Sequence, residues 1–415
     1  RDRRAPDSSR TVSTETPMLL SLTRRMLFEP APRILARLAW TLGWKGSRGM
    51  AAFQKRAARG VRSPAVLFIS LTDRCNLACR GCWVSRATPS RELPLETLDA
   101  IVGEWKQRNR SHFFGLLGGE PLLHPQLAAL LERHRDCYYQ IFTNGTLLDD
   151  RMAAEFHRLG NVTPVVSVEG SPSVSDIRRG GDDVWRRAMA AIEACRRQRL
   201  FFGVASSLCK NNLDDLLCDA FLEDMIRRGA LYAWYYIYRP SGPDPAPDLA
   251  LDAADILRVR RFLVEARRRH PILIVDAYWD ADGRALCPAV EGISHHIGPG
   301  GDLEPCPPIQ FARENLRDGT SLDALFQQST FLEEFRQLAA ANGRGCILLT
   351  NPAALRDFMD RPDIRDTTGR GTGLQELAAM KPRPCHDLPG QEIPERHWLY
   401  RYAKRRWFFG FGTYG

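Results

Sequence analysis

The alternation of short apolar runs with amphipathic segments between residues 65 and 240 is the feature that most constrains the fold. The apolar runs are typical of β-strands and cover Ala65–Leu71, Phe113–Leu117, Gln140–Thr143, Pro164–Val168, Phe201–Ser206 and Trp234–Tyr238. The helical segments between them include Leu95–Gln107, Gln126–Arg135, Asp150–Leu159 and Val184–Arg199. Repeated strand–helix units require parallel pairing with right-handed crossovers. The sequence therefore predicts an α/β fold, a partial (β/α)6 TIM-like barrel, with its chemistry at the C-terminal ends of the strands.

The cysteine content restricts the class of protein. The chain of 415 residues has 11 cysteines, an odd number, without the small dense scaffold of a disulfide-rich secreted protein. Thiols kept for metal or iron–sulfur chemistry in a reducing compartment explain this content better, which predicts a cytoplasmic protein. No uncharged apolar run reaches about 18 residues, so the sequence predicts no transmembrane helix.

Residues 1–61 form a basic N-terminal arm. Basic side chains exceed acidic ones by ten in residues 1–64, against nine for the whole chain, so the rest of the protein is close to neutral. From Arg33 onward apolar residues follow helical spacing, and Trp40 and Trp44 are four apart. This pattern predicts an amphipathic helical arm that lies on an anionic membrane surface, peripheral to the inner membrane face. The alternative is a pair of helices packed on the barrel with arginines outward. The near-neutral body argues against a nucleic-acid partner.

Three cysteines follow the first predicted strand in one short segment. Cys75, Cys79 and Cys82 are spaced so that their thiolates can converge on one 4Fe–4S cluster and leave its fourth iron without a protein ligand. A zinc site would require a fourth thiolate or imidazole, and this segment supplies none. The arrangement resembles the radical S-adenosylmethionine (SAM) superfamily. The resemblance implies a 4Fe–4S cluster, SAM as cosubstrate, and a reductant such as flavodoxin or ferredoxin.

Further motifs lie at the ends of successive predicted strands. Each taken alone is typical of a turn or a polar cap at a strand end, and together they support a cosubstrate site. The resemblance implies cofactor contacts from Gly118, Gly119, Glu120, Pro121, Thr143, Asn144, Ser167, Glu169, Arg178, Ser206 and Tyr238. In particular, it implies that an arginine of the segment Asp176–Gly180 pairs bidentately with the methionine carboxylate of SAM. Where the family often has an aromatic residue just before the third cysteine, this chain has Gly81, and Trp83 follows.

A second set of cysteines lies beyond a predicted linker, Ser241 to Asp248. Cys287 and Cys306 bracket a Gly-rich turn at residues 298–301, which predicts a β-hairpin that brings the two thiols together. This region resembles the twitch or SPASM-like extension that carries one auxiliary 4Fe–4S cluster. The resemblance implies the ligands Cys287, Cys306 and Cys346, with Cys385 either completing the cluster or leaving one iron open to substrate. Zinc binding and buried structural thiols are the alternatives. Ligands less favoured by the pattern are His295, His296 and His386, and packed thiols are predicted for Cys137, Cys195, Cys209 and Cys218.

The predicted organisation is an arm (1–61), a radical SAM partial barrel (62–240), an auxiliary-cluster domain (241–350) and a C-terminal tail (351–415). The resemblance implies reductive cleavage of SAM to a 5′-deoxyadenosyl radical, which abstracts hydrogen from an unactivated C–H bond. The auxiliary cluster would accept an electron or bind substrate. Tyr236 is a candidate catalytic residue in the substrate pocket, and Asp276 is a candidate acid/base group unless it is a solvated loop acid. A membrane-associated or amphiphilic small molecule is the predicted substrate, and a ribosomally made peptide is the alternative. An electron-transfer scaffold would leave the Gly-Gly-Glu-Pro motif unexplained.

Overall fold

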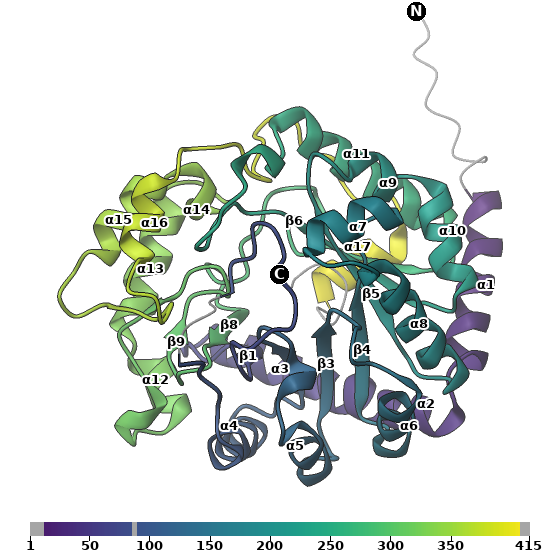
Figure 1. The fold of residues 1–415 in the computed structure, drawn as a ribbon, viewed down its shortest axis with the longest axis horizontal. Helices are drawn as coiled ribbons and strands as arrows, with labels where there is room; N and C mark the ends of the chain where they lie inside the picture. The colour runs from purple at the N-terminus through teal and green to yellow at the C-terminus, as the bar shows by residue number, and fades with distance from the viewer. Residues whose placement is uncertain (1–11, 85–88, 407–415) are drawn as a thin grey trace, which may run out of the picture.

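The computed structural model describes residues 12–84 and 89–406 and contains one mixed sheet at its centre (Figure 1). The strand order is β7-β6-β5-β4-β3-β2-β1-β8-β9. The first seven strands are β1 (Val66–Ser70), β2 (Phe113–Leu117), β3 (Tyr138–Thr143), β4 (Val162–Ser167), β5 (Gly203–Leu208), β6 (Tyr232–Ile237) and β7 (Leu273–Val275). All adjacent pairs among them are parallel. The predicted α/β class and all six predicted strands are confirmed.

The sheet is larger than the six strands that we predicted. The strand β7 extends it beyond β6, and β8 (Ser294–Ile297) pairs in parallel with β1 on the other side. β9 (Leu303–Glu304) is antiparallel to β8 and forms the outer edge. The described strands thus end at two separate edges and do not close a barrel. Because both β7 and β8 lie in this sheet, it crosses the domain boundary predicted at residue 240.

Helices cover the convex side of the sheet (Figure 1). They are α4 (Leu95–Arg108), α5 (Leu127–Arg133), α6 (Asp150–Leu159), α7 (Pro172–Arg179), α8 (Val184–Arg197), α9 (Leu213–Leu216), α10 (Asp219–Arg227) and α11 (Ala253–Arg269). The helix α6 shows why local sequence predicts such elements well. The Asp149 carboxylate caps its first turn by accepting from the Met152 amide at 2.8 Å, and Gly160 ends it with a φ of 69°.

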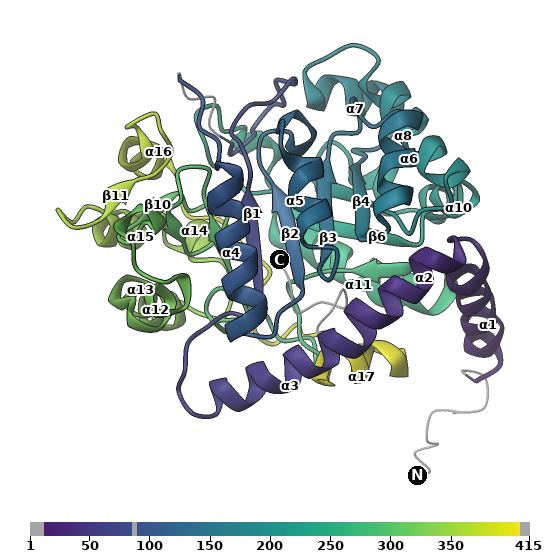
Figure 2. The ribbon, with the colours of Figure 1, turned by 90° about the horizontal axis from the view of Figure 1, so that it is seen from below.

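The N-terminal arm runs under the sheet as α1 (Val12–Phe28), α2 (Pro32–Leu38), a π-helical segment (Ala39–Lys45) and α3 (Gly46–Ala57) (Figure 2). It lies at the N-terminal ends of the strands, because Arg56 donates to the Asn109 carbonyl before β2 and Lys45 to the Asp136 carbonyl before β3. The predicted helices are therefore packed on the sheet, as the alternative interpretation required. Within the described residues, no helix combines the length and apolar character needed to cross a membrane.

The C-terminal region forms a helical layer beside β8 and β9 (Figure 1). Its elements are β10 (Phe311–Ala312), α12 (Leu322–Gln328), α13 (Thr330–Ala341), α14 (Ile347–Thr350), α15 (Pro352–Met359), β11 (Arg365–Asp366) and α16 (Gly373–Ala379). The last helix, α17 (Trp398–Arg406), lies apart from this layer (Figure 1) beside β7, where the Tyr400 hydroxyl accepts from the Ile274 amide at 2.9 Å. The predicted hairpin is present as β8 and β9, and Gly301 in its turn has a φ of 86°. The predicted linker is not a free spacer, because it contains the 3-10 turn Pro247–Leu249 and packs beside the first cysteine segment.

Candidate radical SAM and auxiliary-cluster sites

The first three cysteines lie together at the C-terminal edge of β1, in a loop named here the cysteine loop (residues 72–83). The loop is fixed from two sides. The Arg80 amide donates to the Arg178 carbonyl at 2.9 Å, at the end of α7. Gly81 has a φ of 70°, and a Cβ there would collide with the Tyr238 hydroxyl beyond the end of β6. Gly81 therefore provides the close approach that an aromatic residue at this position would block.

The predicted Gly118-Gly119 pair after β2 packs directly on the cysteine loop. The Gly119 amide donates to the Thr72 carbonyl at 2.8 Å. A Cβ on Gly118 would meet the Thr72 carbonyl oxygen, and one on Gly119 would meet the Arg74 carbonyl oxygen. Because these contacts are with backbone atoms, neither position accommodates a side chain without displacement of the loop.

Glu120 links the end of β2 to the end of β3. Its fully buried carboxylate accepts from the Thr143 hydroxyl and the Asn144 amide, both at 2.8 Å, and from the Leu122 amide at 3.1 Å. Pro121 begins the adjoining 3-10 turn, Pro121–Leu123. The Asn144 side chain in turn donates to Asn76 Oδ1 at 2.9 Å and lies 4.0 Å from the Cys75 sulfur. Glu120, Thr143 and Asn144 therefore form one network that supports the cysteine loop.

Two adjacent arginines at the end of α7 have different partners. Arg178 donates to the Arg80 carbonyl, and its guanidinium lies over the Tyr238 ring at 5.0 Å from the centroid. Arg179 forms an ion pair with Glu169 and lies 3.9 Å from the Cys79 sulfur. The sequence pointed to Arg178 as a cofactor contact, which stays a prediction, and the structure places Arg179 nearer to a cysteine of the loop. No local sequence signal distinguishes the two, because each follows the same turn of one helix.

The remaining predicted contacts lie at the same edge of the sheet. Ser167 is the last residue of β4, and the Ser206 hydroxyl donates to the Val168 carbonyl at 2.6 Å. The neighbouring Ser207 amide donates to Glu169 at 3.2 Å. The structure thus brings the ends of β1 to β6 around the cysteine loop, as the parallel fold predicted.

Comparison with known proteins decides the family of this segment. Residues 69–211 match the radical SAM superfamily. This segment is a radical SAM domain. Pre-heme d1 synthase of Dinoroseobacter shibae is 29% identical over 240 residues, which cover 55% of this chain and 58% of that protein. The mycofactocin maturase MftC of Mycolicibacterium smegmatis is 25% identical over 358 residues, 79% of this chain and 89% of that protein. The first curated relatives are therefore matched over a little more than half of their length.

A solved structure supports the fold. Streptococcus suis SuiB bound to S-adenosylmethionine superposes with a TM-score of 0.56 at 15% identity, over 69% of this chain and 71% of SuiB. The radical SAM domain implies a 4Fe–4S cluster and SAM as its cofactors.

The cysteine loop fits such a cluster better than it fits a single metal ion. The ligands of one tetrahedral zinc ion lie within about 4 Å of each other, given Zn–S bonds of about 2.3 Å. In the described part of the chain, the one group of three metal-binding side chains within 4.8 Å is His112, Asp136 and Cys137. Cys75, Cys79 and Cys82 do not form a group as close as this. Burial and the neighbouring thiols raise the pKa of Cys75 to about 11, so a bound cation is needed to keep this thiol ionised.

The second set of thiols gathers beside the end of β6 and is named here the auxiliary site (Cys287, Cys306, Cys346 and Cys385). Burial raises the pKa of Cys287 to about 11, and charge on Cys346 adds to this shift. The same residue contributes to the raised pKa values of Cys306 and Cys385, so all four thiols share one electrostatic environment. Four neighbouring thiols, of which Cys287, Cys306 and Cys385 have raised pKa values, fit a cluster that would neutralise their charges.

The neighbouring histidines have partners of their own. His295 Nδ1 lies 3.0 Å from the Pro305 carbonyl, and His386 Nε2 lies 3.0 Å from the Leu286 carbonyl. Burial lowers the pKa of each to about 3, which keeps both imidazoles neutral. His296 Nε2 lies 2.8 Å from the Ser70 hydroxyl, and its Nδ1 lies 2.6 Å from Glu304. The sequence did not predict this buried series of contacts among Ser70, His296 and Glu304, because the parallel pairing of β1 with β8 creates it.

The two predicted catalytic residues lie in different surroundings. Tyr236 is half-buried on the inner face of the sheet, stacked on Trp234 at a centroid distance of 5.7 Å and edge-on to Phe142. This aromatic wall includes Phe68, which contacts Phe142. The placement agrees with a role in lining a substrate space, and that role stays a prediction.

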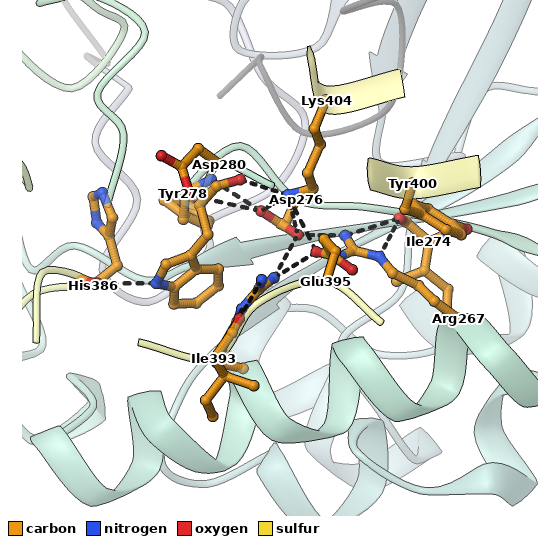
Figure 3. Close-up of polar contacts among 12 residues, drawn as sticks. Arg267, Ile274, Asp276, Tyr278, Asp280, His386, Ile393, Glu395, Tyr400 and Lys404 are labelled. Carbon is orange, nitrogen blue, oxygen red and sulfur yellow. Dashed lines mark hydrogen bonds and ion pairs between the residues drawn. The ribbon is translucent and has the colours of Figure 1, made fainter. Parts of the chain in front are cut away.

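Asp276 lies elsewhere, in a fully buried charge cluster (Figure 3). It pairs with Arg267 and lies 3.4 Å from Lys404, and Glu395 pairs with the same two cations. Lys404 and Arg267 hold the pKa of Asp276 below its usual range despite burial. A carboxylate that stays ionised between buried cations cannot exchange protons readily near neutral pH. Asp276 is therefore neither a catalytic acid/base group nor a solvated loop acid, and we correct the prediction to a structural role.

Proposed function

We propose that this chain is an oxidative radical SAM enzyme with one auxiliary 4Fe–4S cluster. The observation that supports this most is the position of two separate thiol sets on the two sides of the β6 end. Tyr238 contacts Gly81 of the cysteine loop, and the next residue, Arg239, contacts Cys346 of the auxiliary site. Two sites placed side by side in this way suit a reaction in which the first site generates a radical and the second accepts an electron.

When loaded, the first site supplies reductive cleavage of SAM to a 5′-deoxyadenosyl radical, for which a flavodoxin or ferredoxin is the electron donor. The residues of this chain orient that chemistry and exclude water from it. The Gly118-Gly119 backbone leaves room at the loop, and the Glu120 network fixes the end of β3. The aromatic wall of Phe142, Trp234 and Tyr236 keeps the space beneath apolar. An apolar enclosure protects a carbon radical from side reactions.

The auxiliary site favours electron acceptance over substrate ligation. Four cysteines complete the usual ligand set of a 4Fe–4S cluster and leave no iron open. Cys287, Cys306, Cys346 and Cys385 would hold the cluster, which would take up one electron from a substrate that had lost a hydrogen atom to the 5′-deoxyadenosyl radical and that would lose one proton to a base. The product carries a new bond or unsaturation at the oxidised carbon.

Metal content and SAM cleavage test the proposal together. Anaerobically reconstituted wild type is expected to hold about eight irons and to form 5′-deoxyadenosine under reductant. The Cys75/Cys79/Cys82→Ala variant should hold about four irons and form none. The Cys287/Cys306/Cys346/Cys385→Ala variant should also hold about four irons and still cleave SAM. Cys195→Ala, at a buried packed thiol, is the control with full iron content. Eight irons retained in either multiple variant would refute the ligand assignment.

A peptide is the substrate class that the comparisons favour. MftC, named a maturase, matches over most of both chains, and SuiB has been solved with its precursor peptide SuiA. An amphiphilic small molecule is the second candidate. Pre-heme d1 synthase, which by its name makes a heme precursor, is more identical to this chain than MftC is, although over a shorter stretch. Incubation of the loaded enzyme with a tetrapyrrole and with a candidate peptide, followed by mass spectrometry, distinguishes the two by substrate-dependent loss of two hydrogens.

The arm supplies a separate proposal, attachment to an anionic membrane. Trp40 and Trp44 are 57% and 55% exposed, and exposed Arg33 and Arg48 flank them. Such aromatic and basic side chains suit the interface of an anionic bilayer. The arm lies at the opposite end of the strands from the cysteine loop, so an attached arm would turn the catalytic edge away from the membrane. This arrangement favours a substrate that arrives from solution.

Sedimentation with anionic vesicles tests the attachment. Deletion of the arm would uncover the protein surface on which the buried Ile34 and Met50 of the arm pack, so point substitutions are the better probe. Trp40→Ala/Trp44→Ala is expected to lower vesicle binding at least several-fold. The control is Ile177→Ser, which removes a side chain that is 70% exposed at α7. Equal binding by the double variant and the wild type would refute the proposal.

A further inference from the structure

Arg239 places a cation against the thiols of the auxiliary site. It follows the end of β6, and its Nε donates to the Cys346 sulfur at 3.2 Å. The guanidinium lies over the Tyr278 ring at 5.5 Å from the centroid, which fixes the plane of the side chain. The positive charge also acts on Cys306 and Cys287, whose thiol pKa values it lowers against the effect of burial.

The charge of Arg239 has no other counter-ion in the part of the chain that the structure describes. In that part, no carboxylate lies within ion-pair distance of the Arg239 guanidinium, whereas Arg336 and Arg344 each face a carboxylate. Arg336 pairs with Glu333, and Arg344 donates to the Ala285 carbonyl and faces Asp280. Burying part of a cation that faces no carboxylate costs free energy, unless another negative group faces the cation. The thiolates of the auxiliary site are the negative groups at hand.

We propose that Arg239 raises the reduction potential of the auxiliary cluster and thereby makes it an electron acceptor. This inference rests on the proposed function, since it requires that the four thiols hold a 4Fe–4S cluster. Reduction adds one electron and no atom, so the reduced cluster carries one more negative charge than the oxidised one. An N–H donor to a ligating sulfur and a nearby fixed cation both stabilise the more negative state. Arg239 acts here as a positioning and tuning residue, not as a catalytic one.

A redox titration monitored by EPR measures this effect directly. The Cys75/Cys79/Cys82→Ala protein is the background, because it leaves the auxiliary cluster alone to report. In this background, Arg239→Gln is expected to shift the ratio of oxidised to reduced cluster at a fixed potential at least tenfold toward the oxidised form. For a one-electron couple this is a drop of 59 mV in midpoint potential. Arg239→Lys keeps the charge and should recover part of the loss.

A second readout detects the contact between Arg239 and the cluster directly. The same background protein labelled with ¹⁵N-arginine should show a ¹⁵N hyperfine coupling in pulsed EPR of the reduced cluster, and the coupling should vanish in Arg239→Lys. Arg344→Gln is the matched control, since it removes a nearby arginine without a sulfur contact. A shift in Arg344→Gln as large as in Arg239→Gln, or no shift and no coupling, would overturn the inference. Failure of the background protein to bind iron would instead overturn the proposed auxiliary cluster.

Discussion

Asp276→Asn should destabilise the protein far more than the loss of an exposed carboxylate. In the wild type, the buried carboxylates of Asp276 and Glu395 face three buried cations (Figure 3). The substitution leaves those cations with one carboxylate. Breaking a buried ion pair in this way costs about 3–5 kcal/mol, because the remaining charge stays out of water. With an m value of about 3 kcal/mol per M, the midpoint of urea unfolding should fall by about 1–1.7 M.

The assay compares this variant with Asp282→Asn under the same conditions. Asp282 is exposed and pairs with Arg405 at 2.9 Å, so its loss should cost less than about 1 kcal/mol. Limited proteolysis should release the segment that carries Glu395 and Lys404 faster from Asp276→Asn than from the control. A midpoint shift no larger than that of Asp282→Asn would refute the reasoning that this cluster anchors the C-terminal segment.

Three further predictions concern single positions. Gly119→Ala should lower the iron content of the first site because the new Cβ meets the Arg74 carbonyl, whereas Gly103→Ala, with open space around it, should not. Glu120→Gln should cost about 1.5–3 kcal/mol in urea unfolding and weaken SAM binding in equilibrium dialysis, since an amide cannot replace all three acceptor contacts. Burial lowers the pKa of Lys404 to about 8, so between pH 8 and about 10.4 the unfolded chain binds more protons and rising pH favours the folded state. The difference in unfolding free energy between wild type and Lys404→Met should therefore increase from pH 8 to pH 10, and a constant difference would contradict this.

The sequence predicts the repeating part of the fold well because each unit carries its own signals. The helix Asp150–Leu159 and the strand Phe113–Leu117 have the predicted bounds, since capping residues and apolar runs are local features. The strand β7 was missed because it has only three residues and gains its pairing from β6, which ends more than 30 residues earlier in the chain. The same limit applies to β8, whose pairing with β1 spans more than 200 residues of sequence.

The candidate site, too, could be predicted from the sequence only in part. Spacing indicates which cysteines gather, because three lie in one loop and two flank one hairpin. Spacing cannot indicate that Cys385 lies beside Cys346, where its sulfur occupies the space a Cβ on Gly345 would need. Nor can it select Arg179 over Arg178, because only the packing of α7 on the cysteine loop determines which one faces Cys79.

One continuous series of contacts connects the buried charge cluster with the two thiol sites. Glu395 and Lys404, from the C-terminal segment, share their counter-ions with Asp276, directly after β7. Two residues further, the Tyr278 hydroxyl accepts from the Ile237 amide at the end of β6. The next two residues, Tyr238 and Arg239, contact the cysteine loop and the auxiliary site. The C-terminal segment therefore supports the junction between the two sites, although it lies far from the cysteine loop in sequence. This gives the burial of several ionised side chains a structural reason: together they fix the geometry of the junction between the cysteine loop and the auxiliary site.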